Sequence, residues 1–155
     1  MIEARFGHVN LVARDWERLA DFYTRLFGME IVPPIRDYGG PELASATGVD
    51  GAALRGAHLR LPGGGDAGPT LEIFQYATMP DAPDPVANRP GFGHIAFVVP
   101  DVDAARAAVF AAGGGPVGTV VTSQTADGRR VTWTYVTDPE GNILELQAWS
   151  AAVTG

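Results

Sequence analysis

The segment FGHVNLVARD at residues 6–15 returns as FGHIAFVVPD at residues 92–101. Each copy is followed later by a strand-like segment centred on Leu-Glu, TLEIF at residues 70–74 and ILELQ at residues 143–147. An internal repeat of this kind indicates two copies of one supersecondary unit. Equivalent side chains in two such copies are related by a pseudo-two-fold axis and can meet at one point.

The composition is typical of a globular protein with one core. The chain has 155 residues, 46% hydrophobic and 19% charged, so we expect a single domain over residues 1–155. The net charge of −7 argues against binding to nucleic acid or to an anionic membrane, because both need a basic face. The apolar runs are too short to span a membrane and no secretory segment is seen, so we expect a cytoplasmic protein.

Several classes of chemistry are excluded by residue types that the sequence lacks. It contains no cysteine and no lysine, which excludes disulfides, thiolate ligands and Schiff-base chemistry. No serine lies in a Gly-x-Ser-x-Gly elbow, so acyl-enzyme hydrolysis is disfavoured. The glycine runs at residues 63–65 and 113–115 lack the strand-then-helix context of a phosphate-binding loop and indicate turns.

Hydrophobic periodicity predicts the same order of elements, β-α-β-β-β, in both halves. In the first half Asp15 caps the expected helix and Gly28 ends it. Module 1 covers about residues 4–78 and module 2 about residues 91–150, with a proline-rich connector at about residues 77–90. Expected strands are at 6–13, 29–35, 54–61 and 70–76, then at 92–99, 118–122, 131–137 and 143–149, with the second helix at 101–112.

Strand alternation places a histidine and a glutamate on one face of each module. His8 in the first copy corresponds to His94 in the second, and Glu72 corresponds to Glu145. Burying an ionised carboxylate without a partner costs several kcal/mol, a cost that a divalent cation offsets. The sequence therefore predicts a metal site formed by these four residues. His58 has no partner in the repeat and is interpreted as structural or surface, although alternation can bring it near the cavity.

Together these motifs resemble the vicinal oxygen chelate superfamily, which includes glyoxalase I, methylmalonyl-CoA epimerase, extradiol dioxygenases, fosfomycin-resistance enzymes and bleomycin-binding proteins. The resemblance rests on the paired Gly-His strands, the two Leu-Glu strands and the run DPEGNILEL, and it covers residues 6–149. It implies an α+β fold in which two β-α-β-β-β modules form an open, curved eight-stranded barrel around a metal. The ligand positions of metal-binding members match His8, Glu72, His94 and Glu145.

The number of ligands narrows the choice among members of the superfamily. Extradiol dioxygenases and fosfomycin-type transferases resemble a pattern of two histidines and one glutamate, in which Glu72 would be superfluous. Bleomycin-type proteins lack the metal set altogether. Glyoxalase I resembles the chain at all four positions, whereas methylmalonyl-CoA epimerase usually has glutamine in place of Glu72. The glyoxalase type therefore fits best.

The resemblance implies a metal-dependent isomerase, epimerase or lyase that acts on a carbon beside a carbonyl. One divalent ion, nickel, cobalt, zinc or manganese rather than iron, would accept a substrate with adjacent oxygens and stabilise an enediolate. Glu72 or Glu145 would be the catalytic base. A ferrous extradiol-type dioxygenase and a metal-free binding protein of the bleomycin-resistance type remain the alternatives. We expect a homodimer, and the connector permits modules to pair within a chain or to swap between chains.

Strand parity also predicts a substrate pocket with a largely aromatic wall, which would suit an apolar or aryl group. Ordinary packing inside the barrel is the competing interpretation of these side chains. The candidates are Asn10, Phe74, Tyr76, Trp133, Tyr135 and Gln147.

Overall fold

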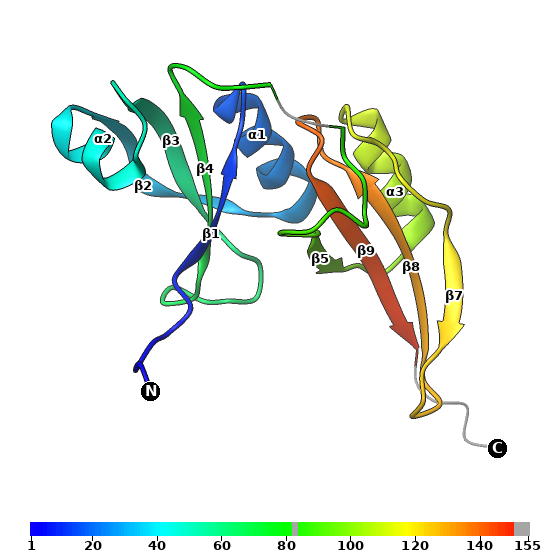
Figure 1. Cartoon of the computed structure of the whole chain (residues 1–155). Coiled ribbons are helices and arrows are strands. Elements are labelled where there is room, and N and C mark those ends of the chain that lie inside the picture. Colours follow the sequence, from blue (N-terminus) through cyan, green and yellow to red (C-terminus); the bar gives the residue numbers. More distant parts are fainter. Residues whose placement is uncertain (82–83, 151–155) are drawn as a thin grey trace. The chain divides into compact units, whose positions relative to one another are not determined.

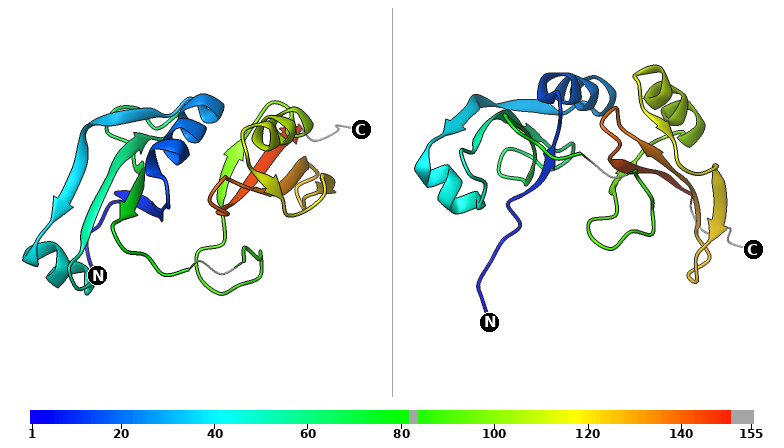
Figure 2. Two further views of the ribbon diagram at one scale, coloured as in Figure 1. Left: turned by 90° about the horizontal axis from the view of Figure 1, so that it is seen from above. Right: turned by 45° about the horizontal axis from the view of Figure 1, so that its top comes forward.

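The computed structural model describes residues 1–81 and 84–150 (Figure 1). The chain divides into two compact units, Met1–Ala82 and Pro83–Gly155. Each unit consists of an open β-sheet with one long helix on one of its faces (Figure 2).

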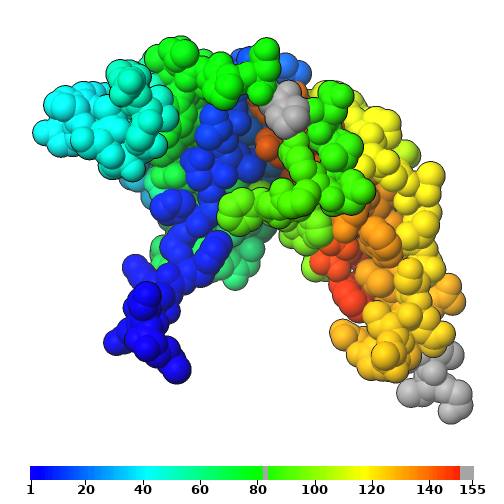
Figure 3. All heavy atoms as spheres, in the orientation of Figure 1, coloured from blue at the N-terminus to red at the C-terminus, as the bar shows by residue number. Residues whose placement is uncertain are grey.

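The first unit contains four strands and two helices, in the strand order β1-β4-β3-β2. β1 runs parallel to β4, and the other neighbours are antiparallel. Residues 1–7 precede the first strand and are exposed (Figure 3). The elements are β1 (His8–Val12), α1 (Trp16–Phe27), β2 (Glu30–Gly39), α2 (Pro41–Thr47), β3 (Ala53–Arg60) and β4 (Thr70–Tyr76).

Helix α1 begins and ends where the sequence predicts. The Asp15 side chain accepts a hydrogen bond from the Arg18 amide at 3.0 Å, and Gly28 ends the helix with a left-handed φ of 65°. The apolar side of α1 contacts β3 and β4, whose inward side chains include Leu71 and Ile73, both fully buried. One face of the first sheet is thus covered by α1, and the side chains of Asn10, His58 and Glu72 lie on the other face.

The second unit repeats this plan, with strand order β5-β9-β8-β6 and with β7 also paired to β8. β5 runs parallel to β9, as β1 does to β4. Helix α3 contacts β8 and β9. The elements are β5 (Ile95–Val98), α3 (Val102–Ala111), β6 (Gly115–Pro116), β7 (Val121–Gln124), β8 (Arg130–Thr137) and β9 (Ile143–Ser150).

The predicted α+β class and the two β-α-β-β-β modules are confirmed, with local differences. The strand expected at residues 118–122 is wrong, because two short strands, β6 and β7, pair with β8 in its place. Between them the amides of Val117 and Gly118 both donate to the Tyr135 carbonyl, at 3.3 and 3.1 Å, which is the pattern of a bulge. The strand expected at residues 92–99 is shorter, so His94 lies immediately before β5.

Cross-strand register aligns the two units residue by residue. In the first sheet Glu72 on β4 lies opposite His58 on β3, and in the second Glu145 on β9 lies opposite Tyr135 on β8. Tyr135 is therefore the positional counterpart of His58. Across the described ranges 1–81 and 84–150, no helix has the length and apolar character needed to cross a membrane.

Candidate metal centre

The polar face of the first sheet carries a row of side chains from three strands. Asn10 on β1 is paired with Glu72 on β4, which is paired in turn with His58 on β3. Because paired residues point to the same side of a sheet, all three side chains project from the face opposite α1. His8, two residues before Asn10, shares that face.

Glu72 is the centre of this row. Its Oε1 lies 2.8 Å from His58 Nε2, and its Oε2 lies 3.5 Å from His8 Nε2. The Asn10 side-chain amide donates to the same Oε2 at 2.9 Å. Glu72 is only 8% exposed, so these partners replace the water that its carboxylate gives up on folding.

These donors fit a divalent cation. Ligand atoms of His8, His58 and Glu72 all lie within 4.8 Å of one another. Bonds of about 2.1 Å to an ion place neighbouring ligand atoms about 3 Å apart, close to the distances from Glu72 to the two imidazoles. Imidazole and carboxylate together suit zinc, manganese, nickel, cobalt and ferrous iron.

His58 is the member of the cluster that the sequence interpretation missed. Its Nδ1 lies 2.8 Å from Thr70 Oγ1, and its ring meets the rings of His8 and Phe74 edge to face, with centroids 5.4 and 6.3 Å apart. Burial lowers the pKa of His58 below 6.5; the charges of Arg36 and His8 act in the same direction, and Glu72 opposes them. Burial therefore favours the neutral form of the His58 imidazole. Only the alternation of β3 pointed to its position.

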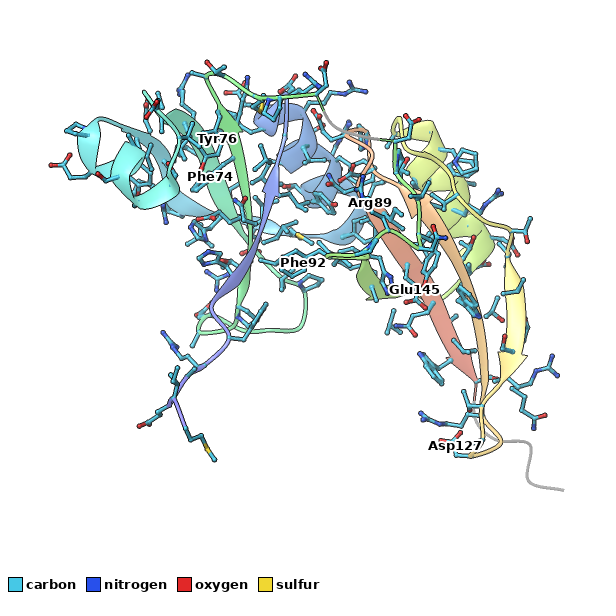
Figure 4. All side chains as sticks on the ribbon, in the orientation of Figure 1. Phe74, Tyr76, Arg89, Phe92, Asp127 and Glu145 are labelled. Atoms are coloured by element: carbon cyan, nitrogen blue, oxygen red, sulfur yellow. The ribbon has the colours of Figure 1, made fainter. Side chains whose placement is uncertain are left out.

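The second unit presents a smaller version of the same arrangement. His94 Nε2 lies 3.0 Å from Glu145 Oε2, and the ring of Tyr135 lies 4.9 Å from that of His94. Glu145 is carried by β9, which begins after a tight turn from β8 (Figure 4). Asp138 fixes that turn, because its carboxylate accepts from the amides of Glu140 and Asn142 at 2.9 Å each.

Each unit therefore brings together the histidine and the glutamate that the sequence assigns to it. His8 and Glu72 are adjacent in the first unit, and His94 and Glu145 in the second. That all four residues bind one ion stays a prediction.

The six predicted pocket residues lie on the strands that carry the two clusters. The residues of the first unit and those of the second unit have different surroundings. Asn10 contacts Glu72 directly. Phe74 and Tyr76 follow Glu72 along β4 at alternate positions (Figure 4). The ring of Phe74 lies over Gly56 on β3, where a Cβ atom would come within 2.6 Å of the ring and 1.9 Å of the Ile73 carbonyl oxygen.

In the second unit the predicted pocket residues pair with one another. The rings of Trp133 and Tyr135 meet edge to face with centroids 5.3 Å apart, and Gln147 lies opposite Trp133 on β9. The Gln147 side-chain oxygen accepts from Trp149 Nε1 at 2.7 Å. These contacts form an aromatic patch next to His94 and Glu145. Their role in binding a substrate remains a prediction.

A separate cavity of about 360 Å³ in the first unit does not coincide with the cluster. It lies where α1 begins and β4 ends, between Trp16, Arg55 and Tyr76, and neither His8, His58 nor Glu72 lines it. Tyr76 is thus the only predicted pocket residue in its lining. The cluster itself lies on an open sheet face, where the His8 side chain is 49% exposed.

Comparison with known proteins agrees with this architecture. Among solved structures, the chain is similar to a glyoxalase family protein from Bacillus cereus, with a TM-score of 0.77 and 21% identity over 97% of each chain. It is also similar to a glyoxalase/bleomycin resistance protein/dioxygenase domain from Frankia sp. EAN1pec, with a TM-score of 0.57 and 19% identity over 96% of this chain and 100% of that one. These likenesses show the fold. A search of curated proteins finds no significant match.

The family model of the Glyoxalase/Bleomycin resistance protein/Dioxygenase superfamily matches residues 5–146. The match includes both Gly-His segments, the first Leu-Glu strand and residues 143–146 of the second. The chain therefore belongs to the Glyoxalase/Bleomycin resistance protein/Dioxygenase superfamily.

Proposed function

We propose that the protein is a divalent-metal-dependent isomerase, epimerase or lyase of the glyoxalase type, which removes a proton from a carbon beside a carbonyl. The observation that carries this proposal is the adjacent imidazole and carboxylate in each unit. Their atoms are 3.5 Å apart in His8 and Glu72 and 3.0 Å apart in His94 and Glu145. Membership of a superfamily with metal-dependent enzymes supports it further.

The proposed ligands are His8, Glu72, His94 and Glu145, from one chain or from two exchanged modules. Four protein ligands leave two positions of a six-coordinate ion for a small substrate with adjacent oxygens. When bound, nickel, cobalt, zinc or manganese supplies the Lewis acidity that favours loss of the proton.

The two glutamates differ in how firmly they are held, which supports different roles. Glu72 accepts from Asn10 and lies against both His58 and His8. The contact found for the Glu145 side chain is His94, at 3.0 Å. A base must release its other partners to receive a proton and return it. We therefore assign Glu145 as the base and Glu72 as the fixed ligand.

The aromatic side chains are proposed to bind the rest of the substrate. Trp133 and Tyr135 are partly exposed beside Glu145, and Phe74 lies next to His58. Such surfaces favour an apolar or aryl group, while Gln147 and Asn10 offer polar contacts. Both sets project from the faces that carry the proposed ligands.

The first test is metal content and proton exchange. The purified protein should contain about one equivalent of nickel, cobalt, zinc or manganese. Small 2-oxo and 2-hydroxy carbonyl compounds should then exchange the proton beside the carbonyl in heavy water, as followed by NMR. A protein that binds none of these ions and exchanges no proton contradicts the proposal and favours a metal-free binding protein.

The second test separates the two glutamates. Glu145→Gln should lower exchange by at least about 100-fold, the scale of a general base, while the fold is retained. Glu42→Gln, on the exposed surface of α2, is the matched control and should exchange like the wild type. Equal activity of the Glu145 variant and the control would exclude Glu145 as the base.

A second candidate is a ferrous extradiol-type dioxygenase, and one observation favours it. The first unit gathers two histidines and one glutamate, His8, His58 and Glu72, a ligand set typical of non-haem iron oxygenases. This candidate predicts oxygen-sensitive iron in the protein, oxygen uptake with catechols, and retention of iron after Glu145→Gln.

A further inference from the structure

We propose that His58 is a positioning residue, which holds the Glu72 carboxylate in the orientation that binds metal by donating its Nε2–H to Oε1. This inference rests on the proposed function, because it concerns how one of the proposed ligands is prepared. It adds a residue that lies outside the set of four ligands and that has no histidine counterpart in the second module.

Sheet pairing sets the distance between the two residues. His58 on β3 and Glu72 on β4 are direct antiparallel partners, so their side chains leave the sheet side by side. His58 Nε2 lies 2.8 Å from Glu72 Oε1, which is hydrogen-bonding distance. The His58 side chain is 19% exposed and that of Glu72 is 11% exposed, so water competes little for this contact.

Both ring nitrogens of His58 have partners, and these partners select one tautomer. Nδ1 lies 2.8 Å from Thr70 Oγ1, a hydroxyl that can donate a hydrogen bond to it. A neutral imidazole has a single N–H, which is then on Nε2 and directed at the carboxylate. The edge-to-face contacts with the rings of His8 and Phe74 limit rotation of the imidazole.

The contact leaves the other oxygen of Glu72 for the metal. Oε2 faces Asn10 and His8, the latter being another proposed ligand. Oε1 accepts the hydrogen bond from His58. A rotation that exchanged the two oxygens of the carboxylate would therefore break this bond. Partners of this kind orient a ligand, and their loss typically weakens metal binding about 10- to 100-fold.

The second module has no imidazole at the equivalent position. Tyr135 occupies the position of His58 opposite Glu145, and its ring lies 4.9 Å from that of His94. The imidazole therefore distinguishes the first glutamate from the second, in agreement with a fixed Glu72.

The test measures Co²⁺ binding to the full-length protein by competition with a chelator, together with the visible absorption of bound Co²⁺. His58→Phe removes the hydrogen bond, and His58→Gln keeps an N–H near the same place. Thr70→Val removes only the hydroxyl that selects the tautomer. Thr122→Val is its matched control, because Thr122 is an exposed strand residue that bonds to Thr132 in the second unit. Circular dichroism checks that each variant is folded.

We expect His58→Phe to weaken Co²⁺ binding about 10- to 100-fold. His58→Gln should restore most of the affinity, Thr70→Val should fall in between, and Thr122→Val should match the wild type. At saturating Co²⁺ the absorption bands of His58→Phe should match those of the wild type, because a positioning residue is not a ligand.

Four outcomes overturn the inference, and the first three differ in what they say of the proposed function. Unchanged Co²⁺ affinity in His58→Phe removes the positioning role and leaves the proposed function intact. Altered absorption bands at saturation make His58 a ligand and support the iron oxygenase candidate. A wild-type protein that binds no Co²⁺ overturns both proposals. If His58→Phe does not fold, the Co²⁺ affinities of the other variants decide. Equal affinities for His58→Gln, Thr70→Val, Thr122→Val and the wild type then overturn the positioning role.

Discussion

Among single residues, Glu72 shows most clearly how the sheet prepares a site. Strand alternation turns it away from α1, and its neighbours on β1 and β3 are an amide and an imidazole. Leu71 and Ile73, on either side of it in β4, are fully buried against the helix. A carboxylate between two core side chains is held in place by the same packing that stabilises the fold.

The hydrogen bond from Asn10 to Glu72 should contribute to stability. Asn10→Ala leaves Oε2 of a buried carboxylate without its amide donor, and the expected loss in the free energy of unfolding is about 1 kcal/mol. Urea denaturation in the presence of a chelator measures it. Asn88→Ala, at an exposed position of the connector, is the control. Equal midpoints for the two variants would show that water replaces the amide at no cost.

His58 should make the metal-free protein less stable in mild acid. Because burial lowers its pKa in the folded state below 6.5, the unfolded chain binds this proton more tightly. The contribution of His58 to the free energy of unfolding is therefore greatest above pH 6.5 and falls as the pH drops below it. The free energy of unfolding of the wild type, measured in chelator from pH 8 to 5, should decrease more than that of His58→Gln. Parallel pH profiles of the free energy of unfolding for the two proteins would contradict the lowered pKa of His58.

Sequence reasoning found Glu72 and His8 but not the role of His58, for a physical reason. The two modules have loops of different length, so the spacing of equivalent positions falls from 86 residues at His8 and His94 to 77 at His58 and Tyr135. Glu72 and Glu145 are recognised as a pair by their shared Leu-Glu motif, whereas His58 and Tyr135 share no such motif. A tyrosine at the second position hides this pair further, and only strand pairing shows the match.

At the scale of elements, boundaries were predicted best where a local signal exists. The two caps of α1 are set by residues directly at its ends, and both appear as predicted. The break between β6 and β7 was missed, because it depends on how the amides of Val117 and Gly118 reach one carbonyl on β8. Such a bulge is a property of the strand pair and has no single-strand pattern.

The left-handed end of α1 offers a test of the helix boundary. Gly28→Ala places a Cβ on a residue with φ of 65°, and the expected cost is about 1 kcal/mol. Gly7→Ala is the matched control, because Gly7 has ordinary backbone angles and no atom within 4 Å of an added Cβ. Thermal unfolding of both variants should show a lower midpoint for Gly28→Ala alone. A normal midpoint there would mean that the helix end tolerates a side chain.

For the whole molecule, the sequence predicted two modules of one topology, and the structure contains them. The repeat carried this prediction, because residues at matching places in both copies take matching places in the sheets. Each half of the predicted ligand set is also present within its own unit. Binding of one ion by both halves would need contacts between modules or chains, and no local sequence pattern encodes such contacts.

Hydrogen exchange can test whether one ion engages both units. If His8, Glu72, His94 and Glu145 bind the same metal, its addition should slow amide exchange in β1 and β4 and also in β5 and β9. Mass spectrometry of peptides from each unit measures this, and Glu145→Gln should lose the protection in both. Protection confined to β1, β3 and β4 would instead show that His8, His58 and Glu72 hold the ion alone.

The contact between Phe74 and Gly56 limits how this surface can diversify. An added side-chain carbon at Gly56 would lie 1.9 Å from a backbone oxygen, so no other residue type fits beneath the ring without moving the strands. The floor of the proposed pocket is therefore made of main chain, which point mutations do not reshape. A larger or smaller proposed pocket would therefore have to come from its walls, above all from replacement of Phe74 itself.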